Sequence, residues 1–171
     1  PTIIYQHLGL AIDDFWVLFV PVVAGMMIGT FISGRVAGHL THARAVDIGY
    51  TIMLITAAIN LACSLWVPVT LLSAIAPPAL YAVGMALAMP NLSLLALDIF
   101  PAHRGLASAL QGFGQTSFNA LVAGLLAPLV SFSLVGVTAG MLVLCVAAFV
   151  LWRVTRHRHL ATEVAAIQAA V

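Results

Sequence analysis

The chain has 171 residues, of which 63% are hydrophobic and only 6% are charged, and its net charge is +1. Because soluble domains carry about 25% charged residues, this composition and a mean hydropathy of +1.15 leave little room for a water-soluble fold. So small a net charge also gives no basis for nucleic-acid binding.

Three long stretches without a charged residue set the expected number of membrane helices. They cover residues 15–34, 48–97 and 105–152. A helix needs roughly 20 apolar residues to cross the hydrocarbon core, so the first stretch holds one span and each of the others holds two. The sequence therefore predicts an all-α membrane protein with five transmembrane helices. We place them at residues 15–38, 48–67, 69–97, 106–130 and 136–152.

The cations of the chain predict its orientation in the membrane. There is no lysine, and alternating spans would bring all the arginines to one side: Arg35, Arg44, Arg104, Arg153, Arg156 and Arg158. The positive-inside rule makes that side the cytoplasm, with a lead-in of residues 1–14 outside and a tail of residues 153–171 inside. Because the chain begins with Pro1 and shows no signal peptide, we expect it to be the latter part of a longer protein.

The first span carries four glycines at spacings typical of closely packed membrane helices. They are Gly25, Gly29, Gly34 and Gly38. We expect them to pack against a neighbouring helix, with cavity lining as the alternative. The connection that follows contains His39 and His42, which lack a third ligand nearby, so no metal site is predicted.

The second and third spans differ in the way they interrupt the apolar pattern. Asn60 is the only strongly polar residue of the second span, and we expect it to hydrogen-bond a neighbouring helix rather than a substrate. The third span is broken by Pro77-Pro78 and again by Pro90-Asn91. Proline frees carbonyl groups and kinks a membrane helix. Two such sites favour a moving or cavity-lining element, although Asn91 satisfying the freed backbone is the plainer interpretation.

The fourth span has the clearest polar pattern of the chain, which we name the polar stripe. It consists of Ser108, Gln111, Gln115 and Asn119. Spacings of three and four residues place these side chains on one helix face. Such a stripe is costly against lipid, so it should face other protein or a water-filled cavity. Together with Asn91, Phe113 and Phe118 it supplies the candidate substrate-cavity residues, with hydrogen bonding between helices as the alternative role.

The last span and the acidic residues further limit the classes of function that the chain can have. Thr138 is the only hydroxyl of the last span, which is therefore suited to face lipid. The acids are scattered over loops and the tail, so we expect no catalytic residues, no enzyme and no cofactor. A channel or part of a transporter fits better. Proton coupling normally needs a carboxylate or histidine at membrane depth, and the predicted spans contain none, so we expect the proton site outside this chain.

One stretch resembles a known family. The residues are Gly84, then Pro90-Asn91, then Phe100-Pro101-x2-Arg104-Gly105-x-Ala107-Ser108-Ala109-Leu110-x-Gly112-Phe113-x-Gln115, and finally Ala127-Pro128. This run is similar to major facilitator superfamily transporters, and within them most similar to the Bcr/CflA group of bacterial drug:proton antiporters. The resemblance implies twelve spans in two six-helix halves, of which this chain would hold helices eight to twelve.

The resemblance also implies partners and a location. The substrate cavity would lie between the halves, with helices eight, ten and eleven of the family contributing to it. The energy source would be the proton gradient, and the partners would be the lipid bilayer, the missing N-terminal half and a small-molecule substrate. The protein would lie in the bacterial inner membrane with its C-terminus in the cytoplasm.

A cytoplasmic gate is a further expectation. Arg35 lies where the family places a copy of the motif Gly-x3-Asp-Arg-x-Gly, although the acid is missing here. We hypothesise that either Arg35 or Arg104 pairs with Asp98 and thereby holds one conformer.

The favoured function is therefore the C-terminal part of a proton-coupled transporter that exports drugs or other small lipophilic molecules by alternating access. A major facilitator carrier for a metabolite such as a sugar or amino acid is the alternative within this class. A non-transporting membrane subunit or a truncated remnant is the alternative from another class. Because alternating access rocks one half against the other, these five helices alone are not expected to transport anything.

Overall fold

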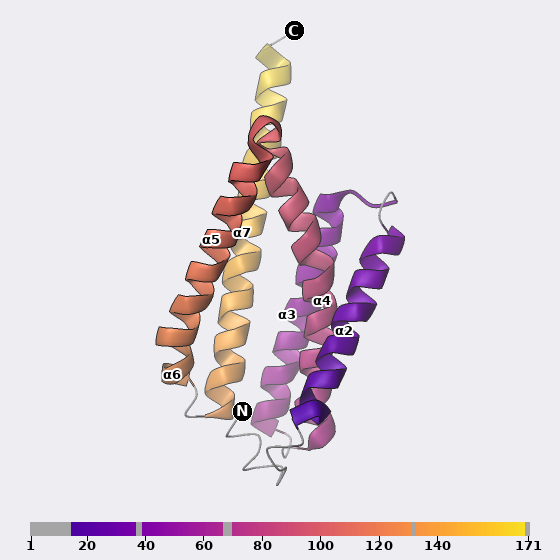
Figure 1. The fold of residues 1–171 in the computed structure, drawn as a ribbon, viewed down its shortest axis with the longest axis vertical. Coiled ribbons are helices and arrows are strands. Elements are labelled where there is room, and N and C mark those ends of the chain that lie inside the picture. Colours follow the sequence, from indigo (N-terminus) through magenta and orange to yellow (C-terminus); the bar gives the residue numbers. More distant parts are fainter. Residues whose placement is uncertain (1–14, 37–38, 67–69, 131–132, 170–171) are drawn as a thin grey trace.

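The computed structural model describes residues 15–36, 39–66, 70–130 and 133–169, and these residues form an all-helical bundle (Figure 1). The elements are α2 (Phe15–Val36), α3 (His42–Trp66), α4 (Leu71–Asp98), the 3-10 turn η2 (Pro101–His103), α5 (Arg104–Leu121), the π-helical turn η3 (Val122–Leu126), α6 (Ala127–Val130) and α7 (Leu134–Ala169). The predicted lead-in of residues 1–14 and Gly38 lie outside the described residues.

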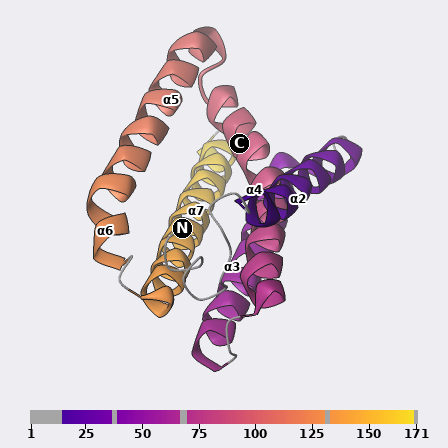
Figure 2. The same ribbon diagram turned by 60° about the horizontal axis from the view of Figure 1, so that its bottom comes forward.

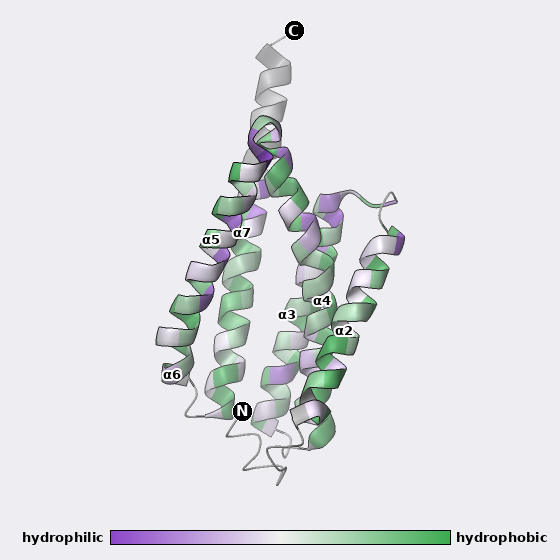
Figure 3. Ribbon diagram, in the orientation of Figure 1, coloured by the Kyte–Doolittle hydropathy of each residue, from purple (hydrophilic) through white to green (hydrophobic). Residues whose placement is uncertain are grey.

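Successive long helices run in opposite directions, so their ends form two layers (Figure 1). The C-terminal end of α2, the N-terminal ends of α3 and α5 and the C-terminal end of α4 lie together, and α7 runs past them. All arginines lie on these segments, so we call this end the basic end. Hydrophilic residues gather there and along α5, whereas the middle of the other helices is mostly hydrophobic (Figure 3).

Four helices are long and apolar enough to cross a membrane. The qualifying segments are Phe19–Val36, His42–Trp66, Leu71–Asp98 and Leu134–Arg156. Their large apolar side chains point outward: Met27 is 69% exposed and Leu72 is 76% exposed. A surface of this kind is stable against lipid and not against water. The predicted class of all-α membrane protein is therefore confirmed.

The prediction of five membrane-crossing helices is confirmed for these four only. The remaining helix, α5, continues through η3 and α6 as one helical run over residues 104–130. At 1.5 Å per residue this run is about 40 Å long, which exceeds the hydrocarbon core. The part of this run that forms α5 is not among the four segments, and it carries the polar stripe.

Two helices extend beyond the predicted spans. The helix α3 begins at His42 rather than at Ile48, and α7 continues to Ala169 rather than ending at Trp152. The limits of an apolar run mark where the chain leaves the hydrocarbon core, but backbone hydrogen bonding can continue in water. Part of the predicted connection and most of the predicted tail are therefore helical.

The helix α4 lies between α2 and α3 and forms the centre of the bundle, because glycines let the backbones touch. A Cβ atom on Gly29 of α2 would come within 2.5 Å of the carbonyl oxygen of Val83, and one on Gly25 would clash with the carbonyl oxygen of Ala79. These two glycines thus pack closely, as expected. Gly34 has open space around it, so it does not share this role.

The contact between α3 and α4 uses a pair of facing glycines. A Cβ atom on Gly49 would lie 2.8 Å from the carbonyl oxygen of Gly84, and the reverse contact is equally close. Val46 and Ala57 of α3 are fully buried nearby. Small residues therefore bring three helices together where the hydrophobic effect gives no driving force.

The last helix, α7, packs on α3 through polar contacts. Asn60 Nδ2 donates to Met141 Sδ at 4.0 Å, which confirms the expected bond from Asn60 to a neighbouring helix. The hydroxyls of Ser64 and Thr138 lie 2.9 Å apart, and Thr138 is buried. The polar side of α7 thus faces protein, while exposed valines such as Val143 cover its outer side.

The glycine contacts give a matched test within one helix. Gly29→Ala should lower the free energy of unfolding by about 1–3 kcal/mol, because the added methyl meets the backbone of α4. Gly34→Ala should leave it unchanged or raise it by up to about 1 kcal/mol, since alanine favours helix. Unfolding in mixed detergent micelles, followed by circular dichroism, measures both. Equal effects of the two substitutions would contradict the packing described for α2.

Candidate functional site

The helix α5 stands apart from the tightly packed helices. It diverges from α4 beyond the turn that joins them, and α6 returns to the start of α7 (Figure 2). None of the described residues of α5 is buried. Along its length α5 is joined to α4 by Gln111, whose Nε2 donates to Ser93 Oγ at 2.6 Å.

The start of α5 is fixed by the turn that precedes it. Pro101 opens the 3-10 turn η2, where its missing N–H costs nothing, and α5 begins at Arg104. A Cβ atom added to Gly105, Gly112 or Gly114 would meet no neighbouring atom within 4 Å. These glycines do not serve close packing, in contrast to Gly25, Gly29 and Gly49.

The polar stripe is mostly uncovered. Ser108, Gln115 and Asn119 are exposed, and Gln111 is half-buried at its bond to Ser93. At 100° per residue the four side chains fall within a sector of about 80°. The structure therefore presents a continuous line of amide and hydroxyl groups along α5.

The candidate aromatic residues do not share this face. Phe113 is 73% exposed and lies roughly opposite the centre of the polar stripe, about 160° around the helix. Phe118 is 54% exposed and lies beside the stripe, about 60° around the helix from its centre. Of the two, Phe118 alone is placed to contact a molecule that binds the amides.

Asn91 lies elsewhere, at the point where α2, α3 and α4 meet. It is buried, its Nδ2 donates to Leu87 O at 2.8 Å and to Ser33 Oγ at 3.2 Å, and its Oδ1 lies 2.8 Å from His42 Nδ1. The carbonyl that Pro90 leaves without its helical donor is that of Ala86, so the bond to Leu87 is not the one that the plainer interpretation required. This side chain joins three helices, and the structure does not bring it together with the polar stripe.

At the basic end, one of the two hypothesised gate pairs is formed. Arg104 Nη2 donates to Asp98 Oδ1 at 3.2 Å, and both side chains are more than half exposed. Arg35 stacks on the ring of Phe31 instead, with its guanidinium carbon 4.8 Å from the ring centre. The pair spans the turn between α4 and α5, the same two helices that Gln111 and Ser93 connect.

A second charged contact at this end was missed by the sequence analysis. Asp47 of α3 accepts a hydrogen bond from Trp152 Nε1 at 2.8 Å and forms an ion pair with Arg156, so it holds α7 against α3. The sequence offered one signal, because Trp152 and Arg156 are four residues apart and share a helix face. Nothing in the sequence identified Asp47 as their partner.

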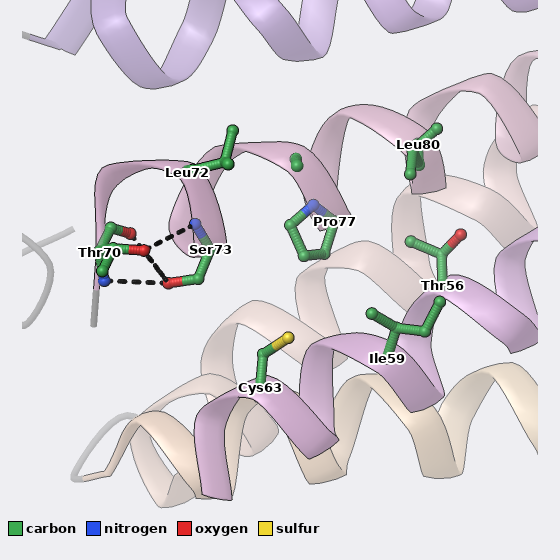
Figure 4. Close-up of a pocket in the computed structure, with 9 residues that line it drawn as sticks. Thr56, Ile59, Cys63, Thr70, Leu72, Ser73, Pro77 and Leu80 are labelled. Carbon is green, nitrogen blue, oxygen red and sulfur yellow. Dashed lines mark hydrogen bonds between the residues drawn. The ribbon is translucent and has the colours of Figure 1, made fainter. Parts of the chain in front are cut away.

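The described residues also enclose a shallow cavity of about 340 Å³ at the opposite end of the bundle, between α3 and α4 (Figure 4). It is lined by Thr56, Ile59, Cys63, Thr70, Leu72, Ser73, Ala76, Pro77 and Leu80. None of the predicted site residues borders it. The hydroxyls of Thr70 and Ser73 at its rim are already used in capping the start of α4.

Comparison with known protein families, with curated proteins and with solved structures gave no match. Within the described part of the chain, no group of three or more His, Cys, Asp or Glu side chains is placed to hold a metal ion. The candidate site therefore rests on geometry and on the polar stripe.

We expect the loss of each ion pair to change the free energy of unfolding by a different amount. Asp47→Asn should lower the free energy of unfolding by about 1–3 kcal/mol, because it weakens two charge-assisted bonds of a half-buried carboxylate. Asp98→Asn should cost under about 1 kcal/mol, since its pair is exposed. Denaturant unfolding in micelles measures both. A larger loss from Asp98→Asn would show that Asp47 does not fasten α7.

Proposed function

We propose that the chain is the C-terminal part of a proton-coupled secondary transporter that exports drugs or other small lipophilic molecules by alternating access. The observation that carries the proposal is the exposed polar stripe of α5, on a helical run as long as a membrane crossing and beside four apolar helices. The sequence resemblance to Bcr/CflA-like major facilitator transporters supports the same conclusion.

The argument starts from the cost of exposing amides to lipid. Each unpaired amide or hydroxyl in hydrocarbon costs several kcal/mol, and the side chains of Ser108, Gln115 and Asn119 are exposed on the described part of the chain. The stripe therefore faces water or protein that completes the membrane domain. A water-filled path between this chain and an N-terminal half meets that requirement.

The chemistry of the stripe suits uncharged or weakly polar solutes. Amides both donate and accept hydrogen bonds, and hydroxyls do the same, so the stripe can bind a solute without a fixed charge. Phe118 beside the stripe adds apolar contact area. A few polar groups within an apolar surround is the usual composition of a small-molecule site.

The proposal assigns proton coupling to the absent half. Asp47 and Asp98, the acids whose side chains are described, both lie at the basic end and are paired with arginines. A coupling group has to lie at membrane depth. Under the positive-inside rule the arginines support an orientation with the basic end and the C-terminus in the cytoplasm, and the family resemblance supports a bacterial inner membrane.

Dye efflux tests the proposal directly. The open reading frame that contains this chain, expressed in cells that lack their main pumps, should lower the accumulation of ethidium, and a protonophore should abolish this effect. Gln115→Ala should reduce the efflux rate about 5- to 10-fold, because a hydrogen bond between uncharged groups contributes about 1 kcal/mol or somewhat more.

Ser117→Ala is the matched control on the same helix. Ser117 lies roughly opposite the stripe, about 160° from its centre, so its loss should leave efflux unchanged at equal expression. Equal losses from both substitutions would mean that α5 tolerates no change, and the stripe would have no special role. Absence of efflux for all dyes would favour the metabolite carrier.

The gate hypothesis predicts how exchanging the charges of Asp98 and Arg104 should change the efflux rate. Asp98→Arg and Arg104→Asp should each change the efflux rate, because each puts like charges across the turn between α4 and α5. An exposed pair contributes up to about 1 kcal/mol, so the change should be about fivefold or less. The double exchange should restore the rate. If Asp98→Asn alone leaves transport unaltered, the pair does not hold a conformer.

A further inference from the structure

Among the arginines of the basic end whose side chains are described, two are paired with an acid and three are not, and one of these three, Arg35, stacks on Phe31. Arg104 is paired with Asp98, and Arg156 is paired with Asp47. Arg44 and Arg153 are exposed and have no acidic partner among the described side chains. These last two therefore carry uncompensated positive charge.

These two arginines flank the place where α3 meets α7. Asp47 on α3 holds Trp152 and Arg156 on α7. Arg44 precedes Asp47 by one helical turn and lies on the same side of α3, and Arg153 follows Trp152 directly. We call this region the α3–α7 junction; it consists of Arg44, Asp47, Tyr50, Phe149, Trp152, Arg153 and Arg156.

Aromatic rings support the exposed guanidinium of α7. Arg153 lies over the ring of Phe149 with its guanidinium carbon 5.8 Å from the ring centre. Phe149 in turn contacts Tyr50 of α3, with ring centres 6.1 Å apart. A guanidinium, an indole and a phenol at one depth are the side chains that proteins place at the level of lipid headgroups.

Below Arg153 the surface becomes apolar. Val150 and Val146 lie three and seven residues before it, on the same side of α7, and they are 52% and 43% exposed. A ligand held by Arg153 would therefore have an apolar part along these valines. A free phosphate ion has no such part, whereas a phospholipid has its acyl chains.

We propose that the α3–α7 junction binds the headgroup of an anionic phospholipid, with Arg44 and Arg153 contacting the phosphate and the acyl chains lying along Val146 and Val150. Asp47 does not repel the headgroup, because Arg156 neutralises it. Basic sites between membrane helices on the cytoplasmic side are suited to such headgroups. The site is separate from the polar stripe, so it does not depend on the transport proposal.

The fluorescence of Trp152 can report lipid binding at the junction. The other two tryptophans, Trp16 and Trp66, lie toward the opposite end of the bundle, so a chain with Trp16→Phe and Trp66→Phe reports from the junction alone. This chain is reconstituted in phosphatidylcholine vesicles with a trace of dansyl-phosphatidylglycerol or dansyl-phosphatidylcholine. Energy transfer from Trp152 should be stronger to the anionic lipid, and unlabelled phosphatidylglycerol should compete.

Substitutions then distinguish a specific lipid site from attraction by the overall positive charge of the basic end. Arg153→Gln and Arg44→Gln, on different helices, should each weaken the competition by phosphatidylglycerol roughly fivefold. Arg104→Gln removes the same charge from the same end but away from the junction, so it should have no effect. Circular dichroism verifies that each variant keeps its helices.

Three results would overturn the inference. Equal transfer to both labelled lipids would show no preference for an anionic headgroup. Equal weakening by Arg104→Gln would assign the attraction to the total charge of the basic end. Relief of energy transfer by inorganic phosphate at matched ionic strength would assign the site to a soluble anion.

Discussion

The close approach of three backbones around α4 is the constraint on which the rest of the structure depends. Gly29 and Gly49 leave no room for a side chain, so α2 and α3 contact α4 directly. Lipid tails are as apolar as leucine, so such contacts and hydrogen bonds hold membrane helices together in place of hydrophobic burial. Asn91 adds to them by joining the same three helices at the basic end. With this trio fixed, α7 is added by polar contacts to α3, and α5 keeps one face uncovered.

The sequence predicted the class, the helices and their alternation, because the physics involved is local. Charge-free runs determine which segments suit a membrane, and the arginines at their ends gather at one end once the helices alternate. The glycines of the first span shared a motif, yet the sequence could not separate Gly29, which touches α4, from Gly34, which faces open space. That difference depends on how far α2 diverges from α4, which no local pattern encodes.

The polar contacts between helices could not be predicted from the sequence either, for the same reason. Gln111 was recognised as part of a stripe, but its partner Ser93 lies on the preceding helix, and the pairing depends on the angle between the helices. Asp47 and Arg156 are far apart in the sequence, so their ion pair follows from the packing of α7 on α3. Phe113 was grouped with the amides because it is near them in sequence, whereas the helical period places it on the other side. The helical period alone could have corrected that grouping.

The π-helical turn η3 limits how far the polar stripe can continue along the helical run. A π-helical turn holds more residues than an α-helical turn, so side chains beyond it are rotated relative to the direction that an undisturbed helix would give them. An additional residue turns the helix face by about 100°. The side of α5 that carries the amides near the basic end is thus not the side that α6 presents at the other end. The line of amides and hydroxyls stops at the turn, and the rest of the helical run carries only apolar side chains, such as Leu125 and Leu129.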